Sequence, residues 1–176
     1  MTILAYDMKT LSTDSLYSDA TEMLVGYHAS KIFIVRQKMI AFCGCELSGQ
    51  AFIDWVIKEE DPEDYPLLDD DFSGVLIDED RVVTFASTCK PIPQYVRFAL
   101  GHSAAAHYAI GLMDLHVPAP EAVRRACGYS LLCGEPVYSL RRDQLKLFPK
   151  DYVGLYTGTI PSKSPKKKST IRDKKK

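Results

Sequence analysis

Thr2 carries the most suggestive catalytic chemistry in this sequence. It follows the initiator methionine directly, and a small residue at that position permits removal of Met1. The mature chain would then begin with a residue that bears both a hydroxyl and a free α-amine. That amine has a pKa of about 8, so part of it is unprotonated near neutral pH and can take the hydroxyl proton. Many chains begin Met-Thr without such a role, so the position alone does not define a catalyst.

The rest of the sequence offers few alternatives to this chemistry. It holds no GxSxG motif, phosphate-binding glycine loop or paired-cysteine metal signature, so we expect neither a metal nor a cofactor. The segment 69–80 imitates a calcium loop in the placement of its acids and glycine. Prolines precede it and β-branched residues follow it, which does not fit a helix on either side. We therefore expect a solvated acidic loop over 59–71.

Strand pairs alternating with helices are predicted by the hydrophobic periodicity. The expected strands cover residues 3–6, 10–12, 32–35, 39–43, 74–77, 81–85, 94–100 and 136–140, and the expected helices cover 47–57, 103–115 and 120–129. The stretch 16–30 is expected to be an irregular connection. Because the helices are segregated between groups of strands, this order favours an α+β antiparallel sandwich covered by helices over a parallel βαβ sheet.

Composition predicts one globular domain over residues 1–160. The chain has 176 residues with 46% hydrophobic content, which is enough for one domain with a real core. No apolar run approaches the roughly 18 residues that a membrane helix needs. The N-terminus lacks a signal-peptide pattern and the five cysteines form no disulfide framework, so a reduced, cytoplasmic protein is expected.

A basic tail is predicted over residues 161–176. It carries eight basic residues against one acid, a net charge of +7, and leaves 14 basic and 22 acidic residues in the body. With a single aliphatic residue the tail cannot bury enough apolar surface to offset its ordering entropy, so we expect it to be disordered. Contact with nucleic acid is the weaker interpretation of its charge, because no nucleic-acid fold signature accompanies it. A solubilising role is the other.

Several segments, in order and spacing, resemble proteasome β-subunits. They are 2–7, 11–15, 31–33 and 40–44, followed by the helix 121–127 and the segment 133–137. HslV-type peptidases and the short phage- and bacterium-encoded proteasome-like proteins are the closer match. The resemblance covers roughly residues 2–140. It implies a four-layer αββα sandwich of the Ntn-hydrolase, proteasome β type.

The resemblance implies roles for five residues. Thr2, freed of the initiator methionine, would be the nucleophile, with the positive charge of Lys31 beside its amine and hydroxyl and Asp14 paired to Lys31. The Gly44 N–H would stabilise the oxyanion, and Ser103 would stand for the serine of the family's Gly-Ser-Gly run. The simpler interpretations are a surface ion pair for Asp14 and Lys31 and a plain turn for Gly44.

The sequence departs from the family where the threonine should be supported. The family commonly carries an aspartate and a serine before its second-half glycine, and here Ser130 and Cys133 stand in those places. The sequence Gly-His-Ser-Ala-Ala stands at 101–105 where Gly-Ser-Gly is usual. This matters because a misplacement of about 1 Å can cost on the order of a hundredfold in rate.

Three functional hypotheses follow. The leading one is a threonine peptidase that hydrolyses a peptide or unfolded-protein substrate inside a homo-oligomeric ring, with an unfoldase as a further partner. The second is a ring-forming proteasome-like protein with weakened or absent catalysis. The third is an unrelated α+β protein whose basic tail binds nucleic acid. The expected location is the cytoplasm, or the host cytoplasm if the protein is phage-encoded.

Overall fold

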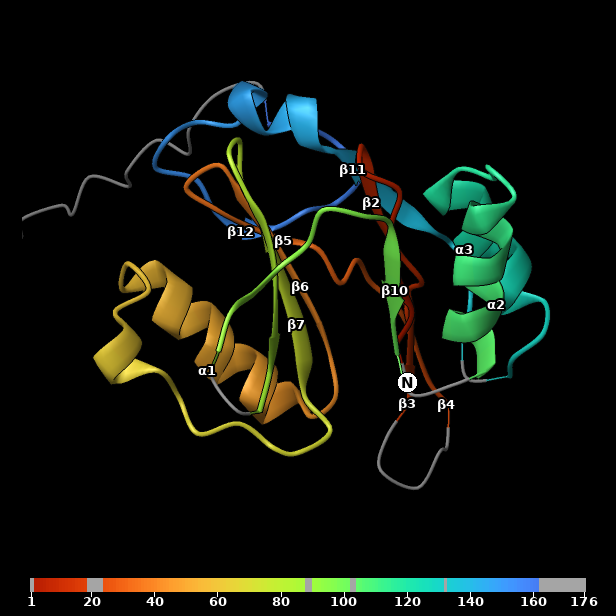
Figure 1. Ribbon diagram of the computed structural model, residues 1–176, viewed down its shortest axis with the longest axis horizontal. Coiled ribbons are helices and arrows are strands. Elements are labelled where there is room, and N and C mark those ends of the chain that lie inside the picture. Colours follow the sequence, from red (N-terminus) through yellow and green to blue (C-terminus); the bar gives the residue numbers. More distant parts are fainter. Residues whose placement is uncertain (1, 19–23, 88–89, 102–103, 132, 162–176) are drawn as a thin grey trace, which may run out of the picture.

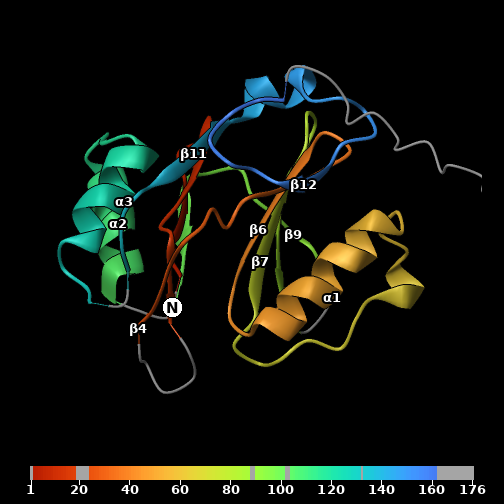
Figure 2. The same ribbon diagram turned by 180° about the vertical axis from the view of Figure 1, so that it is seen from behind.

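Two antiparallel sheets stack face to face, and helices cover the outer face of each. The structure is a computed structural model that describes residues 2–18, 24–87, 90–101, 104–131 and 133–161. In Figure 1 the layers run from α1 (Glu46–Ile57) through two sheets to the pair α2 (Ala104–Asp114) and α3 (Ala119–Cys127). The view from behind shows the same order, with each group of helices confined to its own sheet (Figure 2). The protein is therefore an α+β, four-layer αββα sandwich.

The N-terminal strand lies inside the smaller sheet. This four-stranded sheet has the order β10-β1-β2-β11, and every pair in it is antiparallel. Strands β1 and β2 form a hairpin whose turn places Met8 at a positive φ of 76°, a conformation that glycine adopts more easily. The bounds are β1 Leu4–Tyr6, β2 Thr10–Thr13, β10 Phe98–Leu100 and β11 Tyr138–Arg141.

The larger sheet supplies the opposite wall of the core. It has six strands in the order β12-β5-β6-β7-β8-β9, again all antiparallel. A separate two-stranded ribbon pairs β3 with β4. The bounds are β3 Leu16–Ser18, β4 Leu24–His28, β5 Phe33–Val35, β6 Lys38–Cys43, β7 Ser73–Ile77, β8 Val82–Ala86, β9 Ile92–Pro93 and β12 Val153–Leu155.

Helices cover the outer faces because their apolar residues are buried against the sheets beneath them. Helix α1 buries Phe52 and Trp55 against Phe72 and Phe85 on the outside of the larger sheet. The alanine-rich faces of α2 and α3 pack closely on the smaller sheet. The bounds are α1 Glu46–Ile57, α2 Ala104–Asp114 and α3 Ala119–Cys127, with short 3-10 helices η1 Pro62–Asp64 and η2 Arg142–Leu147.

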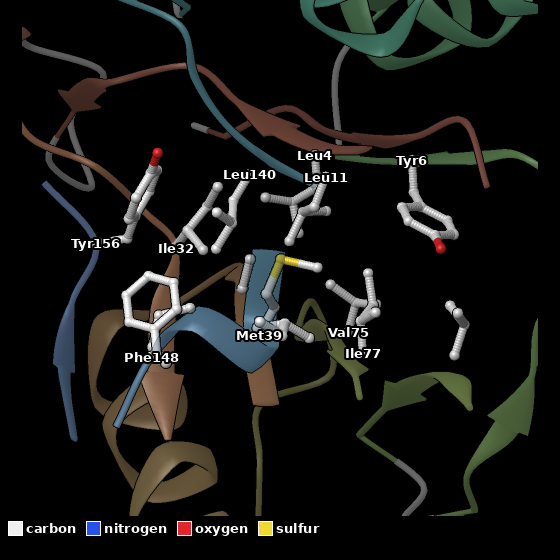
Figure 3. Packing of buried hydrophobic residues seen from close by; sticks show 14 of the residues in the cluster. Leu4, Tyr6, Leu11, Ile32, Met39, Val75, Ile77, Leu140, Phe148 and Tyr156 are labelled. Carbon is white, nitrogen blue, oxygen red and sulfur yellow. The ribbon is translucent and has the colours of Figure 1, made fainter. Parts of the chain in front are cut away.

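Alternation along β1 separates two cores. Leu4 and Tyr6 point into the layer between the sheets, whereas Ile3 and Ala5 point toward α2 and α3. Figure 3 shows Leu4, Tyr6 and Leu11 of the smaller sheet facing Met39, Val75 and Ile77 of the larger one. Because the side chains of a strand alternate between its faces, this register fixes which groups at the ends of β1 and β2 meet the larger sheet.

The expected architecture is confirmed, and two segments were predicted wrongly. Residues 16–30 were expected to be irregular, but they contain β3 and β4. The strand 136–140 was expected to close the domain, yet β12 follows it and pairs with β5. The calcium-like stretch 69–80 runs into strand β7, which confirms the strand expected over 74–77. Within the described residues, no helix is long and apolar enough to cross a membrane.

Candidate active site

The start of β1 is bound to the residue that follows β2. The hairpin register pairs Leu4 with Thr13, which brings Asp14 beside Ile3. The Ile3 N–H donates to Asp14 Oδ1 at 2.9 Å, and the Asp14 N–H donates to the Ile3 carbonyl at 3.4 Å. Ile3 N belongs to the peptide unit that Thr2 begins. The hairpin therefore holds the Asp14 carboxylate against the peptide unit that joins Thr2 to Ile3.

Lys31 reaches the same carboxylate from the segment that leads into β5. Its Nζ lies 2.9 Å from Asp14 Oδ1 and donates to the Leu16 carbonyl at 2.6 Å. The side chains of Lys31 and Asp14 are only 6% and 0% exposed. The pair is therefore buried, and the simpler interpretation of a surface ion pair was wrong.

Asp14 also binds the second half of the chain. Its Oδ2 accepts the Leu16 N–H at 3.2 Å and the Gly134 N–H at 3.4 Å. The Gly134 carbonyl in turn accepts the Ser15 N–H at 3.0 Å. These donors help to offset the desolvation of a buried carboxylate, which is costly unless its lone pairs are satisfied. Asp14 thus joins the N-terminal strand, Lys31 and residue 134 in one network.

Cys43, the last residue of β6, contacts Thr2 from the larger sheet. Its Sγ lies 3.6 Å from the Thr2 carbonyl oxygen, which is within reach of a weak S–H donor. Burial raises the pKa of this thiol to about 12, and the nearby Lys31 charge opposes that rise only in part. The Cys43 side chain is therefore neutral at physiological pH and acts as a donor.

Gly44 follows Cys43 directly and so lies at the border of the site. Its φ of +108° suits glycine, and a Cβ there would stand 3.0 Å from the Asp71 carbonyl oxygen and 3.1 Å from Phe72 Cα. The position thus needs glycine both for its backbone conformation and for its close approach to the segment before β7. Gly44 follows the last residue of β6, and its role as the oxyanion donor stays a prediction.

The structure brings together most of the residues predicted for the site. The Asp14 carboxylate binds Lys31 and the N–H of Ile3, which directly follows Thr2, and Gly44 directly follows Cys43, which contacts the Thr2 carbonyl. Ser103 lies outside the described residues. The sequence analysis missed Cys43 and also Gly101, where a Cβ would stand 2.5 Å from the Thr2 carbonyl oxygen. A glycine directly after a strand end was the one available signal for Gly101.

The two departures from the family pattern lie near this network. Cys133 is buried, and its position close to Cys43 adds to the raised pKa of the Cys43 thiol. The Ser130 carbonyl accepts the Cys133 N–H at 3.4 Å, so the two residues form a turn after α3. This turn leads directly to Gly134 and therefore to Asp14.

A cavity of about 610 Å³ lies away from these residues. It is bounded by the turns between β1 and β2, between β5 and β6, and between β7 and β8, together with η2. These turns are at the opposite ends of the strands from Thr2 and Cys43, so the cavity contains none of the predicted site residues. Among the residues that the structure describes, no group of three His, Cys, Asp or Glu side chains could hold a metal ion.

Comparison with solved structures identifies the fold. Eukaryotic HslV from Trypanosoma brucei matches over 80% of this chain and 99% of its own, with a TM-score of 0.57 and 16% sequence identity. Thiobacillus denitrificans BPH in complex with epoxomicin matches over 80% of this chain and 96% of its own, with a TM-score of 0.53 and 15% identity. A second structure of BPH gives a TM-score of 0.51 at 14% identity. No protein-family model matches the chain, and no curated protein matches it significantly.

These matches assign the αββα sandwich to the proteasome/HslV-like Ntn-hydrolase fold. At 14–16% identity the likeness concerns the fold and not the reaction. The basic tail on which the third hypothesis rests lies, from residue 162 on, outside the described residues. The expected likeness to phage-encoded proteins stays a prediction.

Proposed function

We propose that the protein is an N-terminal-threonine peptidase of the proteasome/HslV type, which hydrolyses peptide bonds after removal of Met1. The observation that carries this proposal is the shared Asp14 oxygen. Asp14 Oδ1 accepts from Lys31 Nζ and from the Ile3 N–H, both at 2.9 Å. One carboxylate atom therefore holds a buried cation and the peptide unit of Thr2 at the same place.

In the proposed first step, Thr2 Oγ attacks the carbonyl carbon of the peptide while the free α-amine of Thr2 takes the hydroxyl proton. The C–N bond of the peptide then breaks, the departing amine receives that proton, and an ester remains on Thr2 Oγ. In the second step a water molecule gives a proton to the α-amine and attacks the ester carbon. The bond from that carbon to Thr2 Oγ then breaks, the α-ammonium returns the proton to Oγ, and the carboxylic acid leaves.

The surrounding groups would favour the charges that develop in these steps. The Lys31 ammonium stabilises negative charge on Thr2 Oγ, and its burial strengthens that interaction because little water screens it. Asp14 keeps Lys31 in place through the 2.9 Å contact. The Gly44 N–H is the proposed donor to the oxyanion, and Ser103 is the proposed support for the α-amine.

The fold also supports proposals about assembly and location. A peptidase with an open, unselective nucleophile is best confined, so we propose a homo-oligomeric ring that admits a peptide or unfolded-protein substrate. An unfoldase partner would feed such a ring. Among the described residues, Cys43, Cys45 and Cys127 are thiols outside any disulfide, which fits the reduced cytoplasm.

A ring-forming protein with weakened catalysis is the second candidate. The observation that favours it is the turn after α3, where Ser130 and Cys133 occupy the places that the resemblance assigns to an aspartate and a serine. A neutral turn would orient the α-amine less firmly than a carboxylate does. The two candidates share the fold and the ring, and they differ in turnover.

The test combines intact mass with turnover of fluorogenic peptides by the purified full-length chain. We expect loss of Met1, a covalent adduct after incubation with epoxomicin, and measurable hydrolysis. Thr2→Ala and Lys31→Ala should each abolish hydrolysis, and Thr2→Ser should keep part of it because the hydroxyl survives. Lys38→Ala, which removes a lysine of β6 paired with Glu60, is the matched control and should keep full activity.

The same preparation separates the two candidates. A ring seen by light scattering, with Met1 retained and with neither adduct nor turnover, would reject the peptidase and leave the second candidate in its place. Turnover that survives in Thr2→Ala would reject both, because the hydrolysis would then depend on another group.

A further inference from the structure

We propose that Cys43 and Gly101 are positioning residues that clamp the peptide unit between Thr2 and Ile3 and so aim the threonine side chain. This inference rests on the proposed function and deepens it, since neither residue belongs to the set assigned from the resemblance. We call the space between the Cys43 thiol and the Gly101 backbone, into which the Thr2 carbonyl fits, the carbonyl slot.

The first wall of the carbonyl slot is the Cys43 thiol. Its Sγ lies 3.6 Å from the Thr2 oxygen, and the side chain is 1% exposed. It shares the inner face of β6 with Met39 and Ala41 in the layer between the sheets. A thiol satisfies the carbonyl there and still packs as a small apolar group, which suits a position that meets both.

The second wall is the backbone of Gly101, directly after β10. A Cβ at this position would stand 2.5 Å from the Thr2 oxygen and 3.6 Å from the Thr2 carbonyl carbon. Real Cβ atoms do not approach an oxygen so closely, and the oxygen here is backbone that cannot swing away. The φ of +144° disfavours other residues as well. Only glycine lets β10 close on the start of β1.

The other end of the same peptide unit is held by Asp14. The Ile3 N–H donates to Asp14 Oδ1 at 2.9 Å while the Thr2 carbonyl occupies the slot. Because a peptide unit is planar, fixing its oxygen and its N–H also fixes the position of Thr2 Cα. The amine and the hydroxyl-bearing Cβ are both attached to that atom. The clamp thus fixes the point from which both groups extend toward Lys31 and leaves only rotations about the Thr2 Cα–C and Cα–Cβ bonds.

The clamp predicts a specific order of effects among variants of the full chain. Cys43→Val keeps a buried apolar group without a donor and should lower kcat roughly tenfold with KM unchanged, while Cys43→Ser keeps a donor and should stay within about threefold of wild type. Gly101→Ala moves Thr2 by more and should cost on the order of a hundredfold in kcat. Amide exchange of Ile3 should accelerate in Cys43→Val and in Gly101→Ala.

Two matched controls separate positioning from general strain. Gly158→Ala introduces a side chain at a positive φ of +88°, but its Cβ would meet only Tyr138 Cε1 at 3.8 Å. Val75→Ala removes buried volume from the same core layer without touching Thr2. Both should leave kcat and the exchange of Ile3 unchanged.

Each outcome decides between the clamp and the peptidase function. Unchanged Ile3 exchange and kcat in Cys43→Val would overturn the clamp, and this variant carries the test if Gly101→Ala does not fold. Equal losses in Gly158→Ala would overturn it too, because strain alone would then account for them. A wild-type chain without turnover, whose Ile3 exchange still responds to Cys43→Val, would defeat the proposed function and leave the clamp as an anchor of the N-terminus.

Discussion

Lys31 and Asp14 form an ion pair that is almost closed to solvent, with Nζ and Oδ1 2.9 Å apart. Burial of two charges is costly, and a buried pair often contributes no more to stability than apolar residues of the same volume would. What this pair does provide is a charge at a fixed position, because backbone N–H groups from three separate segments hold the carboxylate. The proposed reaction needs such a fixed cation near the hydroxyl of Thr2.

Breaking the pair from one side should destabilise the fold strongly. Asp14→Ala leaves the Lys31 ammonium buried without its carboxylate, and we expect a loss of about 3–5 kcal/mol in the free energy of unfolding. The double variant Asp14→Ala/Lys31→Met should lose less than Asp14→Ala, since no charge is then stranded. Urea unfolding measures both. A double variant less stable than Asp14→Ala would contradict this account. Breaking the exposed ion pair Arg141–Asp143 is the control, and it should leave the free energy of unfolding nearly unchanged.

The buried thiol of Cys43 should make stability fall at alkaline pH. Its pKa is raised to about 12 in the native state, whereas an unfolded thiol ionises near about 8.5. Below that value both states keep the proton; above it only the unfolded state releases one. The stabilisation is therefore complete below about pH 8.5 and declines toward pH 12, by about 1.4 kcal/mol per pH unit for one thiol.

Comparison with Cys43→Val isolates this effect, because the Cys127 thiol also has a pKa raised to about 12 by burial. The slope of unfolding free energy against pH between about 9 and 10 should be shallower in Cys43→Val than in the wild type. Parallel slopes in the two proteins would show that Cys43 does not titrate differently on unfolding.

Glycines 44 and 111 should respond to alanine in opposite directions. Gly44→Ala forces a side chain into a φ of +108° and within 3.0 Å of a backbone oxygen, and we expect a loss of about 2 kcal/mol or more. Gly111 lies in the middle of α2, and a Cβ added there would meet nothing within 4 Å, so Gly111→Ala should stabilise by about 0.5–1 kcal/mol. Thermal unfolding of the two variants shows whether each change raises or lowers stability. A Gly44→Ala variant as stable as the wild type would contradict the requirement for glycine at position 44.

Local patterns in the sequence were enough to predict most of the fold. The apolar hairpin of β5 and β6 and the amphipathic helices α1 and α3 can each be recognised from the residues of their own segment. Strand β12 does not, since it has three residues, one of them Gly154, and exists through its pairing with β5 far back in the chain. The ribbon of β3 and β4 is likewise defined by pairing and not by alternation in its sequence.

The residues of the candidate site also differ in whether the sequence could predict them. Asp14 and Lys31 could be named because they fall in segments whose order and spacing resemble a known family. Cys43 and Gly101 also lie in segments compared with the family, but the resemblance gives neither a role, because their contacts with Thr2 arise only when β6 and β10 close on β1. The Cys43 contact joins residues 41 positions apart, and no local pattern encodes a contact of that kind.

The C-terminal boundary of the domain should lie just after Ile160. This residue is partly buried and packs against the core between the sheets, whereas residues 161–176 carry a net +7 and a single aliphatic side chain. A chain that ends at Pro161 should keep its free energy of unfolding within about 0.5 kcal/mol of the full chain. A chain that ends at Thr157 loses Ile160 and should be less stable by about 1–2 kcal/mol. Urea unfolding compares the three lengths, and equal stability of the two shorter chains would place the boundary earlier.

The same chains test the tail for binding to DNA. Binding of the full chain to a DNA column that is lost in the chain ending at Pro161, and that falls steeply with salt, would favour nucleic-acid contact over a solubilising role.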